Sequence, residues 1–301
     1  MHPQVTIAVA QYPITYHKHL DDWAAHIGRW VGDAVQQGAG LLLFPEYGAM
    51  ELVSLMPEAD QRDLQRQIRQ MDRLKADFLS VFGHWAAVYP CILVAPSLPV
   101  TIDGQCFNRC YVFGPKGLAG YQDKLFMTRF ETEEWFIDPG LPQLTVFEAD
   151  WGTFGIQTCY DVEFPLGSAW LCRHGAQLIL APSCTETLRG ATRVHVGARA
   201  RALENQCYVA VSQVVGEAPW SLAVDINYGY TAVYSTPDIG FPDTGVLAMA
   251  EAQQAGWLLQ TLDLSALQHV RANGAVLNAR DHERVGYTFG EQTLTGSTVR
   301  L

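Results

Sequence analysis

Apolar runs and amphipathic stretches alternate along this chain, and the alternation predicts strands and helices in turn. Short runs rich in Val, Ile and Leu predict strands, whereas apolar residues spaced three or four apart predict helices. Strands are expected at residues 5–11, 41–44, 91–97, 107–113, 117–123, 153–158, 177–181, 207–215, 228–235, 246–251 and 257–262. Helices are expected at residues 17–37, 59–88, 164–174 and 190–205.

The order of these elements favours a layered α/β protein. The strands at 107–113 and 117–123 predict a hairpin, and those at 246–251 and 257–262 predict a second, closing hairpin. Hairpins argue against an all-parallel, doubly wound sheet. No low-complexity linker interrupts the chain, so we expect one domain over residues 1–301, with a core in about 4–265 and a tail in about 266–301.

Composition fits a compact enzyme. Of the 301 residues, 49% are hydrophobic and 17% are charged, which is enough apolar material for a large core. The net charge of −11 argues against nucleic acid or an anionic membrane as a partner, because both need basic patches. The N-terminus lacks a basic segment followed by an apolar one, and no run reaches about 20 apolar residues. The expected compartment is the cytoplasm.

The cysteine and histidine patterns predict no metal and no cofactor. The seven cysteines include no CxxC pair, and the closest pair, Cys106 and Cys110, has no second pair or nearby histidine to complete a zinc site. His17 and His19 stand at an expected exposed helix start. We therefore expect most of the thiols to be reduced core residues.

One cysteine is a candidate nucleophile. Cys159 follows the apolar strand at 153–158 and precedes a turn into the helix at 164–174. A strand end exposes a sulfur, and a following helix N-terminus favours the thiolate through its dipole. A buried, inert thiol gives the same local pattern, so the assignment depends on two charged residues upstream.

Those residues are Glu46 and Lys124, each at the end of its own strand-like run. Glu46 follows the run at 41–44, and Lys124 follows the strand at 117–123. A carboxylate can take the thiol proton and return it to a leaving amine, and an ammonium group can stabilise the oxyanion of a tetrahedral intermediate. With a thiolate nucleophile, this combination indicates amide hydrolysis.

The blocks around these three residues resemble those of the nitrilase superfamily of carbon–nitrogen hydrolases in sequence, order and spacing. The blocks are Phe44-Pro45-Glu46-Tyr47, Asp123-Lys124-Leu125 and Thr158-Cys159-Tyr160-Asp161. The resemblance covers nearly the whole chain. It implies a four-layer αββα sandwich, a Glu46–Lys124–Cys159 triad, an oxyanion contact from the backbone N–H of Tyr160, and a homodimer or higher homo-oligomer.

The resemblance also implies a second glutamate shortly after the lysine. Glu131 is the best match, and Glu133 and Glu134 are close competitors. The implied role is to position Lys124 or the substrate. A surface carboxylate on a loop would give the same pattern.

The flanking residues bear on the substrate. Tyr160-Asp161 after the cysteine resembles the amidase-type branches, which favours a small-molecule amide over a nitrile or an N-carbamoyl compound. Members that resemble omega-amidases commonly read Arg-Phe-Pro-Glu where this chain has Glu163-Phe164-Pro165-Leu166. The carboxylate of Glu163 favours a neutral or cationic substrate, unless it only caps the following helix.

Five residues are candidates for substrate contacts because they stand beside triad positions or at a nearby strand end: Tyr47, Trp135, Tyr160, Glu163 and Ser183.

Two alternatives to the triad remain open. One is a papain-like Cys–His pair with His195 or His174 as the base. The other is a catalytically silent binding module on the same fold.

Overall fold

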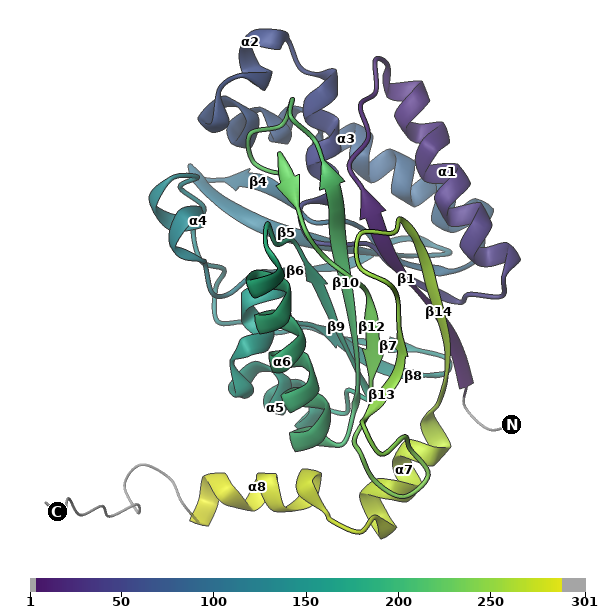
Figure 1. Cartoon of the computed structure of the whole chain (residues 1–301). Helices are drawn as coiled ribbons and strands as arrows, with labels where there is room; N and C mark the ends of the chain where they lie inside the picture. The colour runs from purple at the N-terminus through teal and green to yellow at the C-terminus, as the bar shows by residue number, and fades with distance from the viewer. Residues whose placement is uncertain (1–3, 289–301) are drawn as a thin grey trace, which may run out of the picture.

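The computed structural model describes residues 4–288 (Figure 1). The strands in this range are β1 (Gln4–Pro13), β2 (Leu41–Leu43), β3 (Ile92–Val94), β4 (Leu98–Ile102), β5 (Gln105–Gly114), β6 (Gly117–Asp123), β7 (Val146–Ala149), β8 (Gly152–Ile156), β9 (Leu178–Ser183), β10 (Tyr208–Glu217), β11 (Ile226–Asn227), β12 (Ala232–Tyr234), β13 (Val246–Met249) and β14 (Gly256–Asp263). The α-helices are α1 (Leu20–Gln36), α2 (Glu58–Gln61), α3 (Leu64–Val88), α4 (Arg129–Glu133), α5 (Pro165–Arg173), α6 (Leu188–Asn205), α7 (Leu264–Asn273) and α8 (Asn278–Thr288). Two 3₁₀ segments are η1 (Gly48–Leu55) and η2 (Cys159–Glu163).

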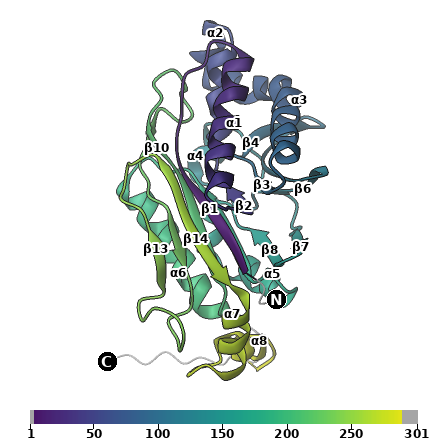
Figure 2. The same cartoon turned by 90° about the vertical axis from the view of Figure 1, so that its right-hand side faces the viewer.

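The strands join into one mixed sheet that divides into two leaves at β1. Along its length β1 pairs in parallel with β2 and antiparallel with β14, and at its C-terminal end it pairs in parallel with β10. The first leaf continues from β2 through β3 and β5 to β4 and β6. The second leaf continues from β10 through β9 and β8 to β7, with β11, β12 and β13 attached. Figure 2 shows β1 and β14 running side by side.

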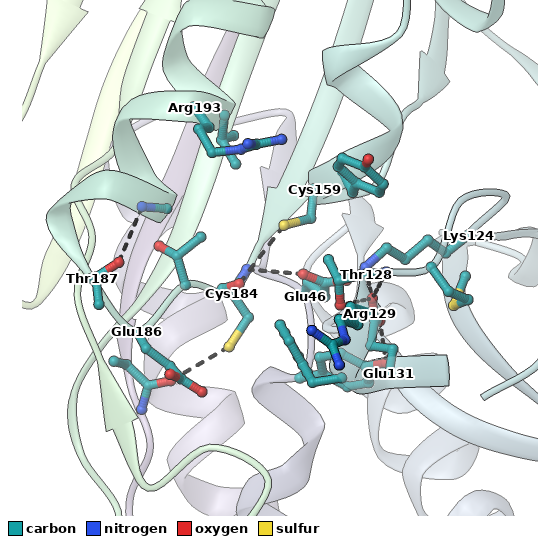
Figure 3. A pocket seen from close by; sticks show the side chains of 18 of the residues that line it. Glu46, Lys124, Thr128, Arg129, Glu131, Cys159, Cys184, Glu186, Thr187 and Arg193 are labelled. Atoms are coloured by element: carbon teal, nitrogen blue, oxygen red, sulfur yellow. Dashed lines mark hydrogen bonds and ion pairs between the residues drawn. The ribbon is translucent and has the colours of Figure 1, made fainter. Parts of the chain in front are cut away.

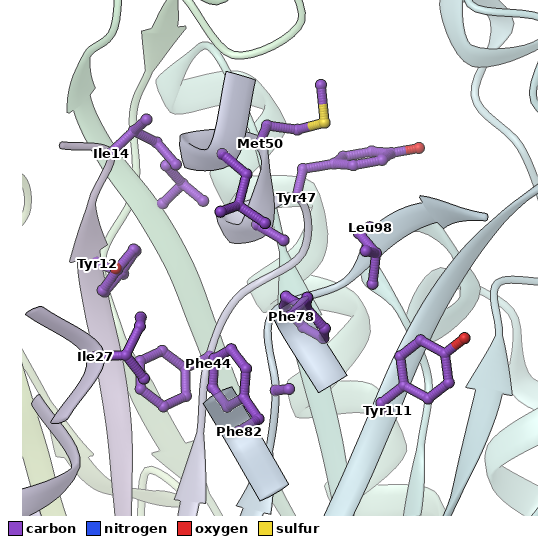
Figure 4. Packing of buried hydrophobic residues seen from close by; sticks show 14 of the residues in the cluster. Tyr12, Ile14, Ile27, Phe44, Tyr47, Met50, Phe78, Phe82, Leu98 and Tyr111 are labelled. Atoms are coloured by element: carbon purple, nitrogen blue, oxygen red, sulfur yellow. The ribbon is translucent and has the colours of Figure 1, made fainter. Parts of the chain in front are cut away.

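Side-chain alternation along the strands packs the two leaves face to face. In β1, Val5, Ile7 and Val9 belong to an apolar cluster shared with β9 and β10 of the second leaf. The alternate residues, Ala8 and Tyr12 among them, pack under α1 and α3 instead (Figure 4). The outer face of the second leaf packs under α5 and α6 in the same way. This is the expected four-layer αββα sandwich.

The second hairpin prediction is wrong. Strands β13 and β14 do not pair with each other: β13 pairs with β12, and β14 pairs along β1 from Gln4 to Gln11. The first hairpin, β5 with β6, is confirmed. The helix expected at 59–88 is divided into α2 and α3, because Asp63 caps a new helix by accepting a hydrogen bond from the Arg66 N–H.

The apolar core continues beyond residue 265. Asp263 caps α7 by accepting from the N–H groups of Ser265 and Ala266, and Leu267 and Val270 then lie fully buried in the cluster between the leaves. The tail expected at 266–301 is therefore partly core, and its residues 289–301 lie outside the described range. Within residues 4–288, every helix is too short or too polar to cross a bilayer.

Candidate active site

The three residues of the predicted triad lie at the ends of three strands and line one cavity of about 420 Å³. Glu46 follows β2, Lys124 follows β6, and Cys159 follows β8 at the first position of η2. Figure 3 shows the Glu46 and Lys124 side chains meeting below the sulfur of Cys159. Because all three positions are strand ends, the rigid sheet fixes their spacing.

Two residues of the site adopt left-handed backbone conformations. Cys159 has φ 48° and Tyr47 has φ 53°. Such values are uncommon for residues other than glycine and cost free energy unless the surrounding structure enforces them. At Cys159 this sharp turn between β8 and η2 turns the side chain into the cavity.

Lys124 joins two carboxylates in a buried ion network. Its Nζ lies 2.8 Å from Oε1 of Glu46 and 2.6 Å from Oε2 of Glu131, and each of the three side chains is only 1% exposed. Two carboxylates beside one ammonium leave a net charge of −1 in a medium of low polarity. Such an arrangement favours transfer of a proton onto one of the carboxylates.

Glu46 is held by two further donors. The side-chain amide of Asn108 donates to Oε1 at 2.9 Å, and the backbone N–H of Cys184 donates to Oε2 at 3.0 Å. The carbonyl of the same Cys184 lies 3.7 Å from the sulfur of Cys159. The backbone of Cys184 therefore contacts both Glu46 and Cys159.

Glu131 is the glutamate that reaches the lysine. Its Oε2 also accepts from the N–H and the hydroxyl of Thr128, both at 2.8 Å, in a capping box at the start of α4. Its Oε1 accepts from the hydroxyl of Tyr47 at 2.7 Å. The competitors lie elsewhere: Glu133 pairs with Arg129 at the surface, and Glu134 is exposed.

Burial and charge set the resting protonation of the site. Burial and the neighbouring Glu46 raise the pKa of the Cys159 thiol well above its usual value, although Lys124 opposes them. Burial also raises the pKa of Glu46, with Lys124 again opposing. Burial is also the largest influence on Glu131 and acts to raise its pKa, but the charge of Lys124 and the hydrogen bonds from Lys124, Thr128 and Tyr47 together lower that pKa. These directions favour the thiol form of Cys159, whereas the sequence pattern favoured a thiolate stabilised by a helix dipole.

Asp161 links the lysine segment to the cysteine segment. Its carboxylate accepts from the backbone N–H groups of Leu125, at 3.1 Å, and Phe126, at 2.8 Å. Asp161 is itself buried, two residues after Cys159. These bonds fix the chain that follows Lys124 against η2.

Four of the five expected substrate contacts line the cavity, namely Tyr47, Trp135, Tyr160 and Glu163. Trp135 packs edge-on against Tyr47, with ring centroids 5.0 Å apart. Ser183 does not line the cavity. Its side chain is fully buried and donates to the carbonyl of Ala181, because Ser183 is the last residue of β9. The next residue, Cys184, lines the cavity instead.

Glu163 is not a free carboxylate. Both of its oxygens accept from Arg193 of α6, with Oε1 3.1 Å from Nε and Oε2 bonded to Nη2. The Arg193 guanidinium also lies 5.9 Å from the ring centre of Tyr160. Since the pair neutralises itself at the cavity wall, Glu163 gives no preference for a cationic substrate, and that expectation loses its basis.

The histidines proposed as an alternative base lie outside the cavity lining. His195 is buried in α6, where Nδ1 lies 2.7 Å from the Tyr234 hydroxyl and Nε2 lies 3.0 Å from the Tyr230 carbonyl. Burial lowers its pKa to about 4. His174 is exposed and bonds to the carbonyl of Trp170. A papain-like Cys–His pair is therefore excluded.

Sequence reasoning missed Asn108, Asp161 and Cys184 as supports of the site. Asn108 is a polar residue in the expected strand at 107–113, which is otherwise apolar apart from Arg109, and this is a usable signal for a buried contact. The Thr128-x-x-Glu131 capping-box pattern likewise favours Glu131 over its neighbours. Cys184 acts through its backbone, so its side chain gives no signal.

Comparison with known proteins shows the family to which this chain belongs. A family model described as carbon-nitrogen hydrolase matches residues 6–272. The probable hydrolase YhcX of Bacillus subtilis is 30% identical over 93% of this chain, which spans 54% of the length of YhcX. An omega-amidase of Xenopus tropicalis is 25% identical over 84% of this chain and 87% of its own.

Solved structures share the fold at lower identity. A carbon-nitrogen hydrolase from Helicobacter pylori superimposes with a TM-score of 0.73 at 18% identity, covering 90% of this chain and 93% of its own. An amidase variant from Nesterenkonia sp. AN1, in complex with butyramide, gives 0.69 at 22% identity, covering 89% and 94%. The family match over most of the chain identifies this protein as a member of the carbon-nitrogen hydrolase family, in the nitrilase superfamily.

Proposed function

We propose that this carbon–nitrogen hydrolase is a cysteine amidase that cleaves a small-molecule amide through a thioester acyl-enzyme. The observation that carries the proposal is the buried Glu46–Lys124–Glu131 network beside Cys159. It supplies a base, a nucleophile and a fixed positive charge in one cavity, as amide hydrolysis requires.

In the acylation half, Glu46 takes the proton from the Cys159 sulfur, and the sulfur attacks the amide carbon. Lys124 and the backbone N–H of Tyr160 stabilise the oxyanion. The tetrahedral intermediate then breaks its C–N bond, and the departing nitrogen receives the proton from Glu46. Ammonia or an amine leaves, and a thioester on Cys159 remains.

In the second half, Glu46 takes a proton from water, and the resulting hydroxide attacks the thioester carbon. The C–S bond breaks, the carboxylic acid leaves, and the thiol recovers its proton from Glu46. Glu131 positions Lys124 throughout and keeps it charged. The raised pKa of Glu46 suits a group that alternately accepts and returns a proton.

The cavity supports a small substrate. Its volume of about 420 Å³ lies near the lower end of the range for small-molecule sites. Tyr47 and Trp135 provide an aromatic wall, and the Glu163–Arg193 pair provides a polar wall of no net charge. We propose a compact amide whose acyl group presents an apolar face to the aromatic wall.

Ammonia release from a panel of primary amides, nitriles and N-carbamoyl compounds tests this function, with wild type beside Cys159→Ala. Amidase activity predicts release from one or more amides, abolished in the variant. Faster release from a nitrile or a carbamoyl compound would replace the amide assignment. Absence of ammonia release from every compound would favour a larger secondary amide or acyl transfer to another nucleophile first, and a silent binding module next.

We also propose that the chain forms a homodimer or a higher homo-oligomer. Apolar side chains are exposed on α5 and α6, with Leu166 81% and Val196 63% exposed. Exposed apolar residues gathered on neighbouring helices are typical of an interface. Light scattering on the wild type should give at least twice the chain mass of 33.3 kDa, and Val196→Glu should lower it. A wild-type monomer would refute this proposal.

A further inference from the structure

We propose that His17, His26 and Glu51 form a binding site for a divalent transition-metal ion such as Zn²⁺, separate from the catalytic cavity. His17 precedes α1, His26 lies in α1, and Glu51 lies in η1. Each side chain offers one ligand atom, and these atoms lie within 4.8 Å of one another. The three residues are absent from the lining of the catalytic cavity.

The distances fit tetrahedral coordination. Nε2 of His17 lies 3.0 Å from Oε1 of Glu51, and Nε2 of His26 lies 3.7 Å from the same oxygen. In a tetrahedral zinc site with bonds of about 2.0–2.1 Å, neighbouring ligand atoms lie about 3.3 Å apart. The two observed distances bracket this value, and all three ligand atoms lie within 4.8 Å of one another, so side-chain movements alone would bring them around one ion.

His26 supplies an independent observation. Its Nε2 is buried and makes no hydrogen bond to any residue between 4 and 288, although buried polar atoms nearly always have a partner. The ring is held against Tyr12 and His17, with ring centroids 6.0 and 5.0 Å away. A metal ion would satisfy this nitrogen, and two imidazoles with one carboxylate are a ligand set that zinc favours.

Surrounding donors hold the carboxylate in place. Oε2 of Glu51 accepts from the Tyr12 hydroxyl at 2.6 Å and from the indole N–H of Trp23 at 3.0 Å. Oε1 accepts from the backbone N–H of Thr15 at 3.0 Å. Metal-binding carboxylates are typically oriented by such outer hydrogen bonds. A fourth coordination position would be left for water or another small ligand, as in zinc sites with three protein ligands.

Binding of the ion requires no oxidation or reduction of the protein. His17 binds the ion as the neutral imidazole tautomer with its proton on Nδ1, so that the Nε2 lone pair is free and the hydrogen bond to Glu51 is replaced by bonds from both groups to the ion. The ion would tie three segments together, and one of them, η1, begins directly after Glu46 and Tyr47. We infer a bracing role for the metal, which does not depend on the proposed amidase activity.

The test uses the full chain without an affinity tag. After equilibration with ZnSO₄ and removal of loosely bound metal on a chelating resin, elemental analysis should give one zinc per chain. Titration calorimetry should show about 100-fold weaker binding in His26→Gln. The matched control is His19→Gln, because His19 is an exposed histidine at the start of the same helix, and it should bind as the wild type does.

Cobalt provides a second readout that needs no variant. Co²⁺ bound to the wild type should give the intense visible absorption of a four-coordinate site, and Zn²⁺ should displace it. Zinc that washes off the wild type, or that binds equally well to His26→Gln, would overturn the proposal. A weak, octahedral Co²⁺ spectrum would overturn it as well.

Discussion

The ammonium nitrogen of Lys124 lies 2.6 Å from the carboxylate of Glu131, closer than the 2.8 Å that separates it from Glu46. Because Glu131 is itself fixed by Thr128 and Tyr47, the lysine is anchored from the side away from the nucleophile. Glu46 is then the carboxylate that can change its protonation while Lys124 stays in place.

Replacing Glu131 by Gln should therefore lower kcat by about 10²-fold, the scale of losing one aligned oxyanion donor. KM should change little, because the neutral variant still fills the same space. Steady-state kinetics on the best amide measures both. The control is Glu133→Gln, which alters an exposed pair with Arg129 and should leave kcat unchanged. Equal effects of the two variants would contradict a positioning role for Glu131.

The same variant should shift the acidic limb of the pH–rate profile. Burial, and to a lesser extent the Glu131 charge, raise the pKa of Glu46 above the ordinary value of 4.5, against the effect of Lys124. Glu46 acts as a base when ionised, so activity falls as the pH drops through this raised pKa. Removing the Glu131 charge lowers that pKa, and the limb of kcat/KM should move to lower pH. A limb that moves upward would refute the assignment of Glu46 as the base.

Breaking the Glu163–Arg193 ion pair should change the preference of the enzyme for charged amides. Glu163→Gln frees the guanidinium and should lower KM for anionic amides by about 3–5-fold, the scale of a partly exposed ion pair. Arg193→Gln should do the same for cationic amides, and the double variant should return both values to near wild type. KM values measured on matched anionic, neutral and cationic amides check this. If all three variants leave KM unchanged for every amide, the pair does not face the substrate.

Asp161 should matter for stability because it satisfies buried backbone donors. Asp161→Ala leaves the N–H groups of Leu125 and Phe126 without their acceptor, at a cost of about 1–3 kcal/mol each. Asp161→Asn keeps an acceptor oxygen and should retain most of the free energy of unfolding. Urea unfolding of the three proteins measures the differences. Equal losses in the Asn and Ala variants would show that the carboxylate charge matters more than the hydrogen bonds.

The meeting of Glu46, Lys124 and Cys159 in one cavity could be anticipated from the sequence because each residue lies within three positions of the end of a strand. The alternation along β1 likewise predicts a strand with two buried faces. Its partners were not predictable, because β1 pairs with β14 across nearly the whole chain. Local turn signals therefore suggested a hairpin of β13 and β14 that does not form.

The supports of the site were hidden for a related reason. Asn108 and Cys184 meet Glu46 across sequence separations of 62 and 138 residues. Glu163 forms its ion pair with Arg193, which belongs to α6 and lies 30 residues further along the chain. The prediction that His17 lies at an exposed helix start is wrong. The side chain is buried, with Nε2 beside the carboxylate of Glu51. The pattern of apolar and polar residues along the chain does not reveal contacts between residues that are far apart in the sequence.

The most direct test of the central claim is mass spectrometry of the enzyme quenched in acid during turnover of its best amide. We predict a covalent adduct on the peptide that contains Cys159, with the mass of the amide minus ammonia. The adduct should be absent from Cys159→Ala, which should release no ammonia. Turnover by the wild type with no adduct on Cys159, or sustained ammonia release by Cys159→Ala, would contradict the thioester mechanism.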